Sequence, residues 1–152
     1  MTSRLLSLRA AVLVASTCAG GCDRGPQLAE VEGVITCGGR PLAKVEVVFL
    51  PDQERGTLGP RSGGYTDDAG RYRLTAPGGG AGAAVGTHRV TVRDLTAIRG
   101  SSGATGAPVG AGSVPKVRFA ANYQSPSTTP LTAVTVQPGG NVINFDLPGP
   151  DK

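Results

Sequence analysis

The residues able to carry out chemistry are few in this chain of 152 residues. It contains one histidine, His88, and three cysteines, Cys18, Cys22 and Cys37. A metal site commonly takes roughly three or four ligands from histidine, cysteine and carboxylate side chains, and the acids of this chain are dispersed. Alternation of apolar and polar residues places His88 on the inward face of a strand. We therefore expect no catalytic residues, no metal ligands and no cofactor.

Two adjacent carboxylates, Asp67 and Asp68, raise the alternative of a calcium site. Ca²⁺ takes about six to eight oxygen ligands, of which two neighbouring acids supply only a fraction. The surrounding residues 64–74 have the pattern of a β-hairpin, in which Asp67 hydrogen-bonds the backbone two residues on and Gly70 takes a positive φ. We expect Asp67 and Asp68 to form this turn rather than a metal site.

The first segment has the pattern of a secretory leader. Residues 1–9 carry Arg4 and Arg9 and no acid, an apolar stretch covers residues 10–15, and small residues follow. This is the order of features in a signal peptide, and the apolar run is far shorter than the roughly 20 residues that span a bilayer. The alternative is an N-terminal helix packed on the domain, but the stretch has neither a polar face nor a capping signal. We expect residues 1–21 to be cleaved.

The end of this leader resembles a bacterial lipoprotein signal. In that motif small residues precede a cysteine that becomes the lipidated first residue of the mature protein, and residues 19–21 precede Cys22 in this way. Ala19 replaces the usual leucine three residues before the cysteine. Cys18 is the rival attachment site, although Thr17 beside the cleavage point fits less well than glycine. The resemblance implies acyl chains such as palmitate on Cys22, each buried CH₂ contributing about 0.8 kcal/mol to membrane binding.

The same resemblance implies where the protein works. A lipidated Cys22 would hold it on a membrane of the cell envelope, on the periplasmic or outer side, with residues 22–29 as a tether. Asp23 resembles the residue that retains some enterobacterial lipoproteins in the inner membrane, and which membrane is used stays open. Cys37 would then be a free, buried thiol. If Cys18 carries the lipid instead, Cys22 could form a disulfide with Cys37 in the oxidising envelope.

The charge pattern bears on the partners of the mature chain. Loss of residues 1–21 removes two of the 15 basic residues and none of the 11 acidic ones, which leaves a net charge of 13 − 11 = +2. The remaining charges are scattered, with no lysine or arginine block and no interleaved aromatic residues. Nucleic acid is therefore not an expected partner.

The body of the chain has the pattern of an all-β domain. Glycine and proline, 24 and 12 residues, together make up 36 of 152 positions, which disfavours a helical bundle. Seven short stretches alternate with period two, as half-buried strands do, and the last two cover residues 131–136 and 142–147. The expected inward residues are Val31, Gly33, Ile35, Cys37, Val45, Val47, Phe49, Tyr72, Leu74, Ala76, His88, Val90, Val92, Ile143, Phe145 and Leu147.

These strands predict a seven-stranded β-sandwich over residues 30–148. A glycine-rich stretch, residues 100–112, interrupts it and buries too little apolar area to offset its ordering entropy, so we expect a loop there. A spacer is the simpler interpretation of this loop, and a binding loop is the alternative. Residues 149–152 form a tail.

Three parts of the domain resemble carboxypeptidase regulatory-like domains. The matches are residues 31–35 with 40–47 (V-x-G-x-V, then G-x-P-L-x-x-V-x-V), residues 65–72 (T-D-x-x-G-x-Y/F) and residues 86–92 (G-x-Y-x-V-x-V). His88 stands where an aromatic residue is usual in the third motif. The C-terminal part, residues 122–147, is similar to small lipoproteins of planctomycete-type bacteria. The resemblance implies a transthyretin-like, or prealbumin-like, sandwich, a class with no established activity.

The expected function is therefore not enzymatic. Hydrolases of the transthyretin-like fold carry several histidines, whereas this chain has one. We expect a lipid-anchored envelope module with a structural or protein-interaction role and an unknown ligand. The alternative is an accessory domain that binds carbohydrate or another small ligand. Tyr65 and Tyr123 are the aromatic candidates for stacking on a glycan, because Tyr72 points inward.

Overall fold

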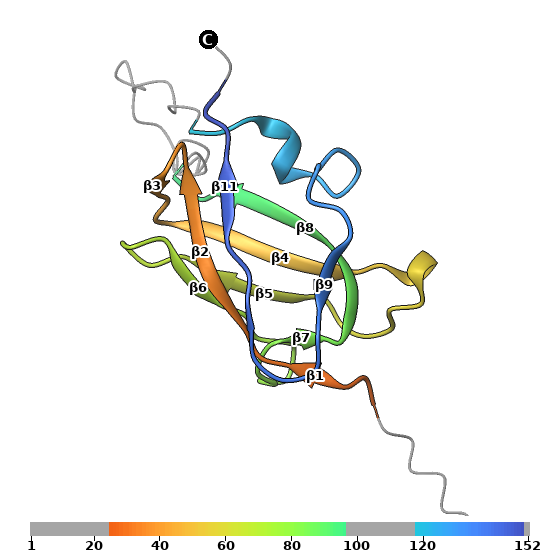
Figure 1. Cartoon of the computed structure of the whole chain (residues 1–152). Coiled ribbons are helices and arrows are strands. Elements are labelled where there is room, and N and C mark those ends of the chain that lie inside the picture. The colour runs from red at the N-terminus through yellow and green to blue at the C-terminus, as the bar shows by residue number, and fades with distance from the viewer. Residues whose placement is uncertain (1–24, 97–117, 151–152) are drawn as a thin grey trace, which may run out of the picture.

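The computed structural model describes residues 25–96 and 118–150 (Figure 1). Within these residues the chain is mostly β, and its strands form several sheets. The described helical segments are two short 3₁₀ helices, η1 (Gln53–Arg55) and η3 (Ala121–Gln124). The expectation of an all-β fold is confirmed.

Several of the features expected from the sequence lie outside the described residues. These are the signal peptide (residues 1–21), both candidate lipid-attachment sites, Cys18 and Cys22, and the glycine-rich stretch at residues 100–112.

One sheet is built around β2 (Val31–Cys37). Its antiparallel neighbours are β6 (Arg71–Arg73) and β3 (Arg40–Pro41), and its parallel neighbours are β10 (Asn141–Val142) and β11 (Phe145–Leu147). Figure 1 shows β6 and β11 on opposite sides of β2. The C-terminal segment thus closes the sheet beside the first long strand.

The second sheet is antiparallel throughout and has the order β5-β4-β8-β9. Its strands are β5 (Ser62–Tyr65), β4 (Val45–Pro51), β8 (Gly86–Asp94) and β9 (Val134–Val136). A two-stranded sheet of β1 (Leu28–Ala29) and β7 (Ala83–Ala84) lies near the start of β2 (Figure 1).

The expected strand at residues 131–136 is shorter in the structure, and the one at residues 142–147 is interrupted. Ala133 has a positive φ of 62°, which breaks the extended backbone before β9. The interruption separates β10 from β11 at Asn144, whose Oδ1 accepts a hydrogen bond of 2.8 Å from the backbone N–H of Val34. The Asn144 side chain thus replaces a backbone carbonyl as the hydrogen-bond acceptor for Val34.

The core lies between the two larger sheets. The expected inward residues of β2, β4, β6 and β8 are buried except Cys37, which is only half-buried at the end of β2, and Phe49, Val90 and Val92 have no exposed surface. Alternation explains this result, since successive side chains of a strand point to opposite faces. Ile143 and Phe145 are only partly buried, although both pack against the core as expected.

Candidate ligand-binding groove

The outer face of the β5-β4-β8-β9 sheet carries an open groove of about 620 Å³. Its floor includes Glu46, Val48 and Leu50 of β4. These side chains point away from the core because their neighbours Val47 and Phe49 point into it. The groove is therefore a direct consequence of alternation on β4.

One end of the groove is a row of three side chains from three strands. Register places Glu46 opposite Tyr65 of β5 and opposite Arg93 of β8. Arg93 forms an ion pair with the Glu46 carboxylate at 2.5 Å, and the Tyr65 hydroxyl lies 3.5 Å from the same carboxylate as its donor. Tyr65 is 65% exposed. The aromatic ring of Tyr65 is thus exposed to solvent beside the ion pair of Glu46 and Arg93.

The floor continues in two further rows along the strands. Val48 lies opposite Gly63 of β5 and Thr91 of β8, and Leu50 lies opposite Arg89. With a rise of about 3.4 Å per residue, the four steps from the first row to the last span about 14 Å. The glycine at position 63 adds no side chain to the floor, so the groove stays open in its middle.

Two chain segments form the sides of the groove. Residues 75–77 line it beside β5, held by paired backbone hydrogen bonds of 2.9 and 3.0 Å between Thr75 and Gly63. Gln124 and Pro126 line it beside β8, and the Pro126 carbonyl accepts a hydrogen bond of 3.2 Å from an Arg89 terminal nitrogen.

The groove carries more positive than negative charge. Its lining holds Arg61, Arg93 and the single acid Glu46. Glu46 pairs with Arg93, and among the described residues neither Arg61 nor the adjoining Arg89 takes part in an ion pair. The Nε of Arg89 is buried and has no hydrogen-bond partner in the described part of the chain. An anionic group would match this charge.

His88 lies in the core, as expected. It has no exposed surface, and its ring packs on Phe49 with centroids 5.7 Å apart. Nδ1 lies 3.2 Å from the Gly86 carbonyl, and Nε2 has no partner among the described residues. Burial lowers the pKa of His88, partly offset by the contact with Gly86. A neutral imidazole sealed from solvent cannot meet a dissolved substrate.

Asp67 forms the predicted turn. Its Oδ1 accepts hydrogen bonds from the backbone N–H groups of Ala69, at 2.9 Å, and Arg71, at 2.8 Å, and Gly70 has a φ of 73°. Hydrogen bonds from the backbone of Arg71, from its side chain and from the N–H of Ala69 lower the pKa of Asp67, and together they outweigh the opposing effect of burial. Among residues 25–96 and 118–150, no three His, Cys, Asp or Glu side chains are grouped as a metal site.

Tyr123 is not available for stacking on a glycan, so this part of the expectation is wrong. It is only 8% exposed and packs edge-on against Phe119, with ring centroids 6.4 Å apart. The helix η3 that carries it lies against β8. The sequence around Tyr123 has no strand periodicity, so it did not indicate that this ring would pack against Phe119.

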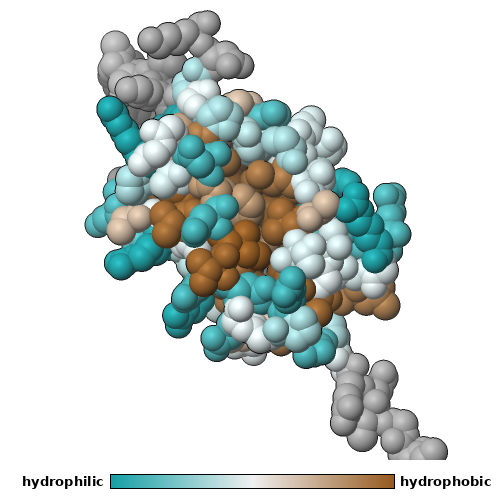
Figure 2. Space-filling view, in the orientation of Figure 1, coloured by the Kyte–Doolittle hydropathy of each residue, from teal (hydrophilic) through white to brown (hydrophobic). Residues whose placement is uncertain are grey.

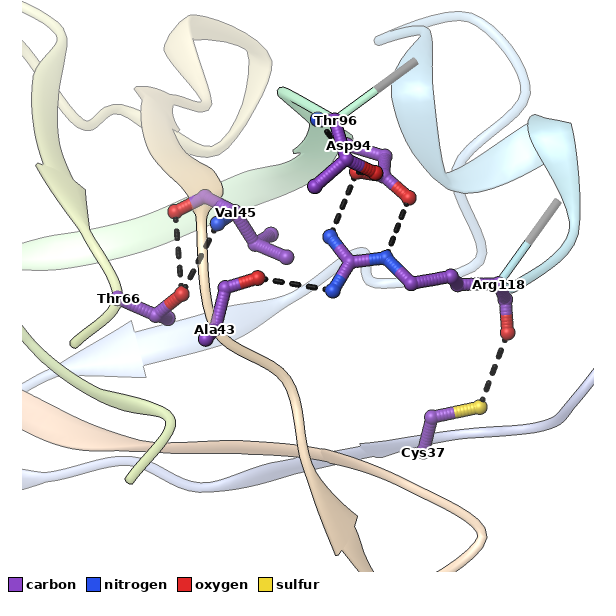
Figure 3. A network of polar contacts seen from close by, with 7 residues as sticks. All are labelled: Cys37, Ala43, Val45, Thr66, Asp94, Thr96 and Arg118. Carbon is purple, nitrogen blue, oxygen red and sulfur yellow. Dashed lines mark hydrogen bonds and ion pairs between the residues drawn. The ribbon is translucent and has the colours of Figure 1, made fainter. Parts of the chain in front are cut away.

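Cys37 belongs to a polar cluster that sequence reasoning missed (Figure 3). Its half-buried thiol is free among the described residues and donates a hydrogen bond of 3.2 Å to the Arg118 carbonyl. The Arg118 guanidinium binds both carboxylate oxygens of Asp94 at 2.6 Å and donates to the Ala43 carbonyl at 2.8 Å. The cluster joins the ends of three segments and has a structural role.

Asp94 is held ionised by this cluster. Burial alone would raise its pKa, but hydrogen bonds from Arg118 and Thr96, together with the Arg118 charge, outweigh burial and lower the pKa. The pair is not apparent in the sequence because residues 95–117 separate Asp94 from Arg118.

A second surface lies on the opposite side of the molecule from the groove. Figure 2 shows a hydrophobic area over β2, β11 and β9. Phe145 of β11 and Val134 of β9, together with Ile143 and Leu131, are partly buried and pack against the core, and Val142 of β10 is 71% exposed. This area offers apolar contact.

Comparison of the chain with protein-family models, with curated proteins and with solved structures finds no match. None of the described helices is long and apolar enough to cross a membrane.

Proposed function

We propose that the protein is a non-catalytic binding module of the cell envelope, anchored to a membrane by acyl chains on Cys22. One observation carries the proposal: an open groove presents Tyr65 and the Glu46–Arg93 pair to solvent, whereas the only histidine is sealed in the core. The solvent-facing side chains of the groove suit recognition, since they offer an exposed aromatic ring beside a carboxylate that is paired with a guanidinium.

We assign the domain to the transthyretin-like sandwiches of the carboxypeptidase regulatory-like class. Seven principal strands support this proposal when the interrupted β10–β11 is taken as one: β2, β4, β5, β6, β8, β9 and β10–β11. The turn between β5 and β6 closes at Asp67 and Gly70, as the resemblance implies, although β5 pairs with β4 and β6 with β2 rather than with each other. The remaining strands, β1, β3 and β7, have two residues each.

The anchor would place this module close to the membrane. The described chain begins at Gly25, and the Gln27 carbonyl accepts a hydrogen bond of 2.8 Å from Val85, so the fold is already engaged there. Gln27 lies five positions after Cys22, and an extended chain spans about 17 Å at most over five steps. The rival site, Cys18, would lengthen the tether by four residues.

A second candidate function is contact with a protein. The hydrophobic area over β2, β11 and β9 favours it (Figure 2), because contiguous exposed apolar surface often marks an interaction site. The hydrophobic area lies over β2, β11 and β9, whereas the groove is lined from β4, β5 and β8, so both functions are compatible with one module.

Membrane fractionation with mass spectrometry tests the proposal. The protein should enter the detergent-soluble membrane fraction and yield an acylated N-terminal peptide that starts at Cys22. Cys22→Ser should abolish acylation, and the matched variant Cys18→Ser should leave it intact. Acylation that survives Cys22→Ser but not Cys18→Ser would move the anchor to Cys18. A protein that carries no acyl group and stays out of the membrane fraction would overturn the proposal.

A further inference from the structure

We propose that the groove binds an acidic oligosaccharide, with a sugar ring on Tyr65 and a carboxylate at the end that Arg61 lines. This inference rests on the proposed function and names the ligand class of the same site. Three features of the groove support it: the exposed ring of Tyr65, the neighbouring Glu46–Arg93 pair, and an arginine that forms no ion pair among the described residues.

The aromatic ring of Tyr65 lies outside the hydrophobic core. Its side chain is 65% exposed and lies on the outer face of β5, away from the core. The Glu46 carboxylate lies 3.5 Å from its hydroxyl. A flat, solvent-exposed aromatic face can stack on the C–H face of a pyranose, and a tyrosine has few rotatable bonds to order on binding.

The polar groups beside this ring suit sugar hydroxyls. Glu46 retains acceptor lone pairs and Arg93 retains N–H donors after they pair with each other. Thr91 and Gln124 add groups that both donate and accept, further along the same groove. Vicinal hydroxyl groups need donors and acceptors side by side, and this end of the groove supplies them.

The other end of the groove selects for negative charge. Leu50 lies opposite Arg89, and Arg61 lines the groove just before β5. Neither arginine forms an ion pair among the described residues. Arg61 lines the groove, whereas Arg89 adjoins it with its Nε buried and a terminal nitrogen donating to the Pro126 carbonyl. A carboxylate is the group that a guanidinium binds with paired hydrogen bonds. The floor length of about 14 Å between the two ends accommodates a di- or trisaccharide.

A peptide is a poorer occupant for this groove. Peptides commonly bind a sheet by adding a strand to its edge, where backbone groups are free. The floor strand β4 is paired on both sides, with β5 and with β8. A ligand in the groove therefore meets side chains on the face of the sheet. The floor strand β4 offers it no unpaired edge to which a peptide strand could add.

Titration of the full-length protein in detergent micelles tests the inference, with trigalacturonate as the probe. Maltotriose is the neutral saccharide control, and triglutamate is the acidic peptide control. We expect saturable binding of trigalacturonate that weakens as salt is added, since the arginines are near the surface. Tyr65→Ala and Arg61→Ala should each weaken it about tenfold, a loss equivalent to about 1.4 kcal/mol.

Matched variants outside the groove keep the test specific. Arg40→Ala removes an exposed arginine of β3 on the other sheet, and Leu58→Ala removes an exposed apolar side chain. Both should leave the dissociation constant unchanged, and all four variants should keep the wild-type melting curve.

Four results would overturn the inference. Equal binding of maltotriose would show that the ligand needs no carboxylate. Equal binding of triglutamate would show that the groove binds acidic peptides as well as it binds acidic saccharides. Binding that survives both groove variants would place the site elsewhere. Absence of saturable binding of trigalacturonate would reject the ligand class, whereas the proposed function would still stand or fall on acylation at Cys22.

Discussion

The hydroxyl of Tyr72 donates a hydrogen bond of 2.7 Å to the backbone carbonyl of Ile143, and the carbonyl fits there because residue 33 is glycine. A Cβ on Gly33 would lie 1.9 Å from the Ile143 oxygen and 3.0 Å from the Tyr72 ring. Gly33 and Tyr72 are cross-strand partners. Three segments distant in sequence are thus tied together at the break between β10 and β11.

Tyr72→Phe should lower the free energy of unfolding by about 1 kcal/mol, because it removes one hydrogen bond while keeping the ring in the core. Burial raises the pKa of Tyr72, so the hydroxyl remains a donor at all physiological pH values. Gly33→Ala should cost more, since a backbone carbonyl has to move. Urea denaturation measures both, with Val142→Ala on the exposed side of β10 as the control expected to have little effect. Equal midpoints for Gly33→Ala and wild type would refute this account of the break.

Arg118→Ala should destabilise the fold by about 3 kcal/mol, because it leaves the buried Asp94 carboxylate without its counter-charge. The matched control is Arg73→Ala, which breaks an exposed ion pair with Glu32 and should cost less than about 1 kcal/mol. The folded-state pKa of Asp94 lies below its unfolded value, so its contribution is present above about pH 4 and is lost as pH falls through the folded pKa. Thermal melts of both variants at neutral pH measure the difference. Similar losses for Arg118→Ala and Arg73→Ala would contradict the buried character of the Asp94 pair.

The sequence predicts which residues face the core far better than it predicts the groove. Alternation along a strand is local, so Val45 and Val47 could be assigned to the buried face without knowledge of their neighbours. The row of Tyr65, Glu46 and Arg93 depends on register between three strands, which turn lengths and packing determine together. Each of these residues reads as an outward polar or aromatic position, and only the pairing of strands brings them to one place.

His88 should make the fold less stable below about pH 6.5. Its folded-state pKa is lowered from 6.5 by burial, so the unfolded state binds its proton first as pH falls. Stability is fully present above the unfolded pKa and declines between that value and the lower folded one. We expect His88→Phe, which keeps an aromatic ring beside Phe49, to reduce the change in melting temperature between about pH 7.5 and about pH 5. Because the chain has no other histidine, an unchanged pH profile in His88→Phe would rule out this residue as the cause.

Cys37 should be a free thiol in the membrane-extracted protein. It lies at the end of β2 remote from β1 (Figure 1), and the seven residues of β2 span about 20 Å. If Cys22 is acylated and Cys18 leaves with the leader, Cys37 has no partner thiol within the chain. We expect iodoacetamide to modify Cys37 slowly in the folded protein, since the half-buried thiol is bonded to the Arg118 carbonyl, and completely in denaturant without reductant. Arg118→Ala loosens that cluster and should speed modification under native conditions, whereas Arg73→Ala should not. A thiol that reacts in denaturant only after reduction would contradict this prediction and would point to lipid attachment at Cys18.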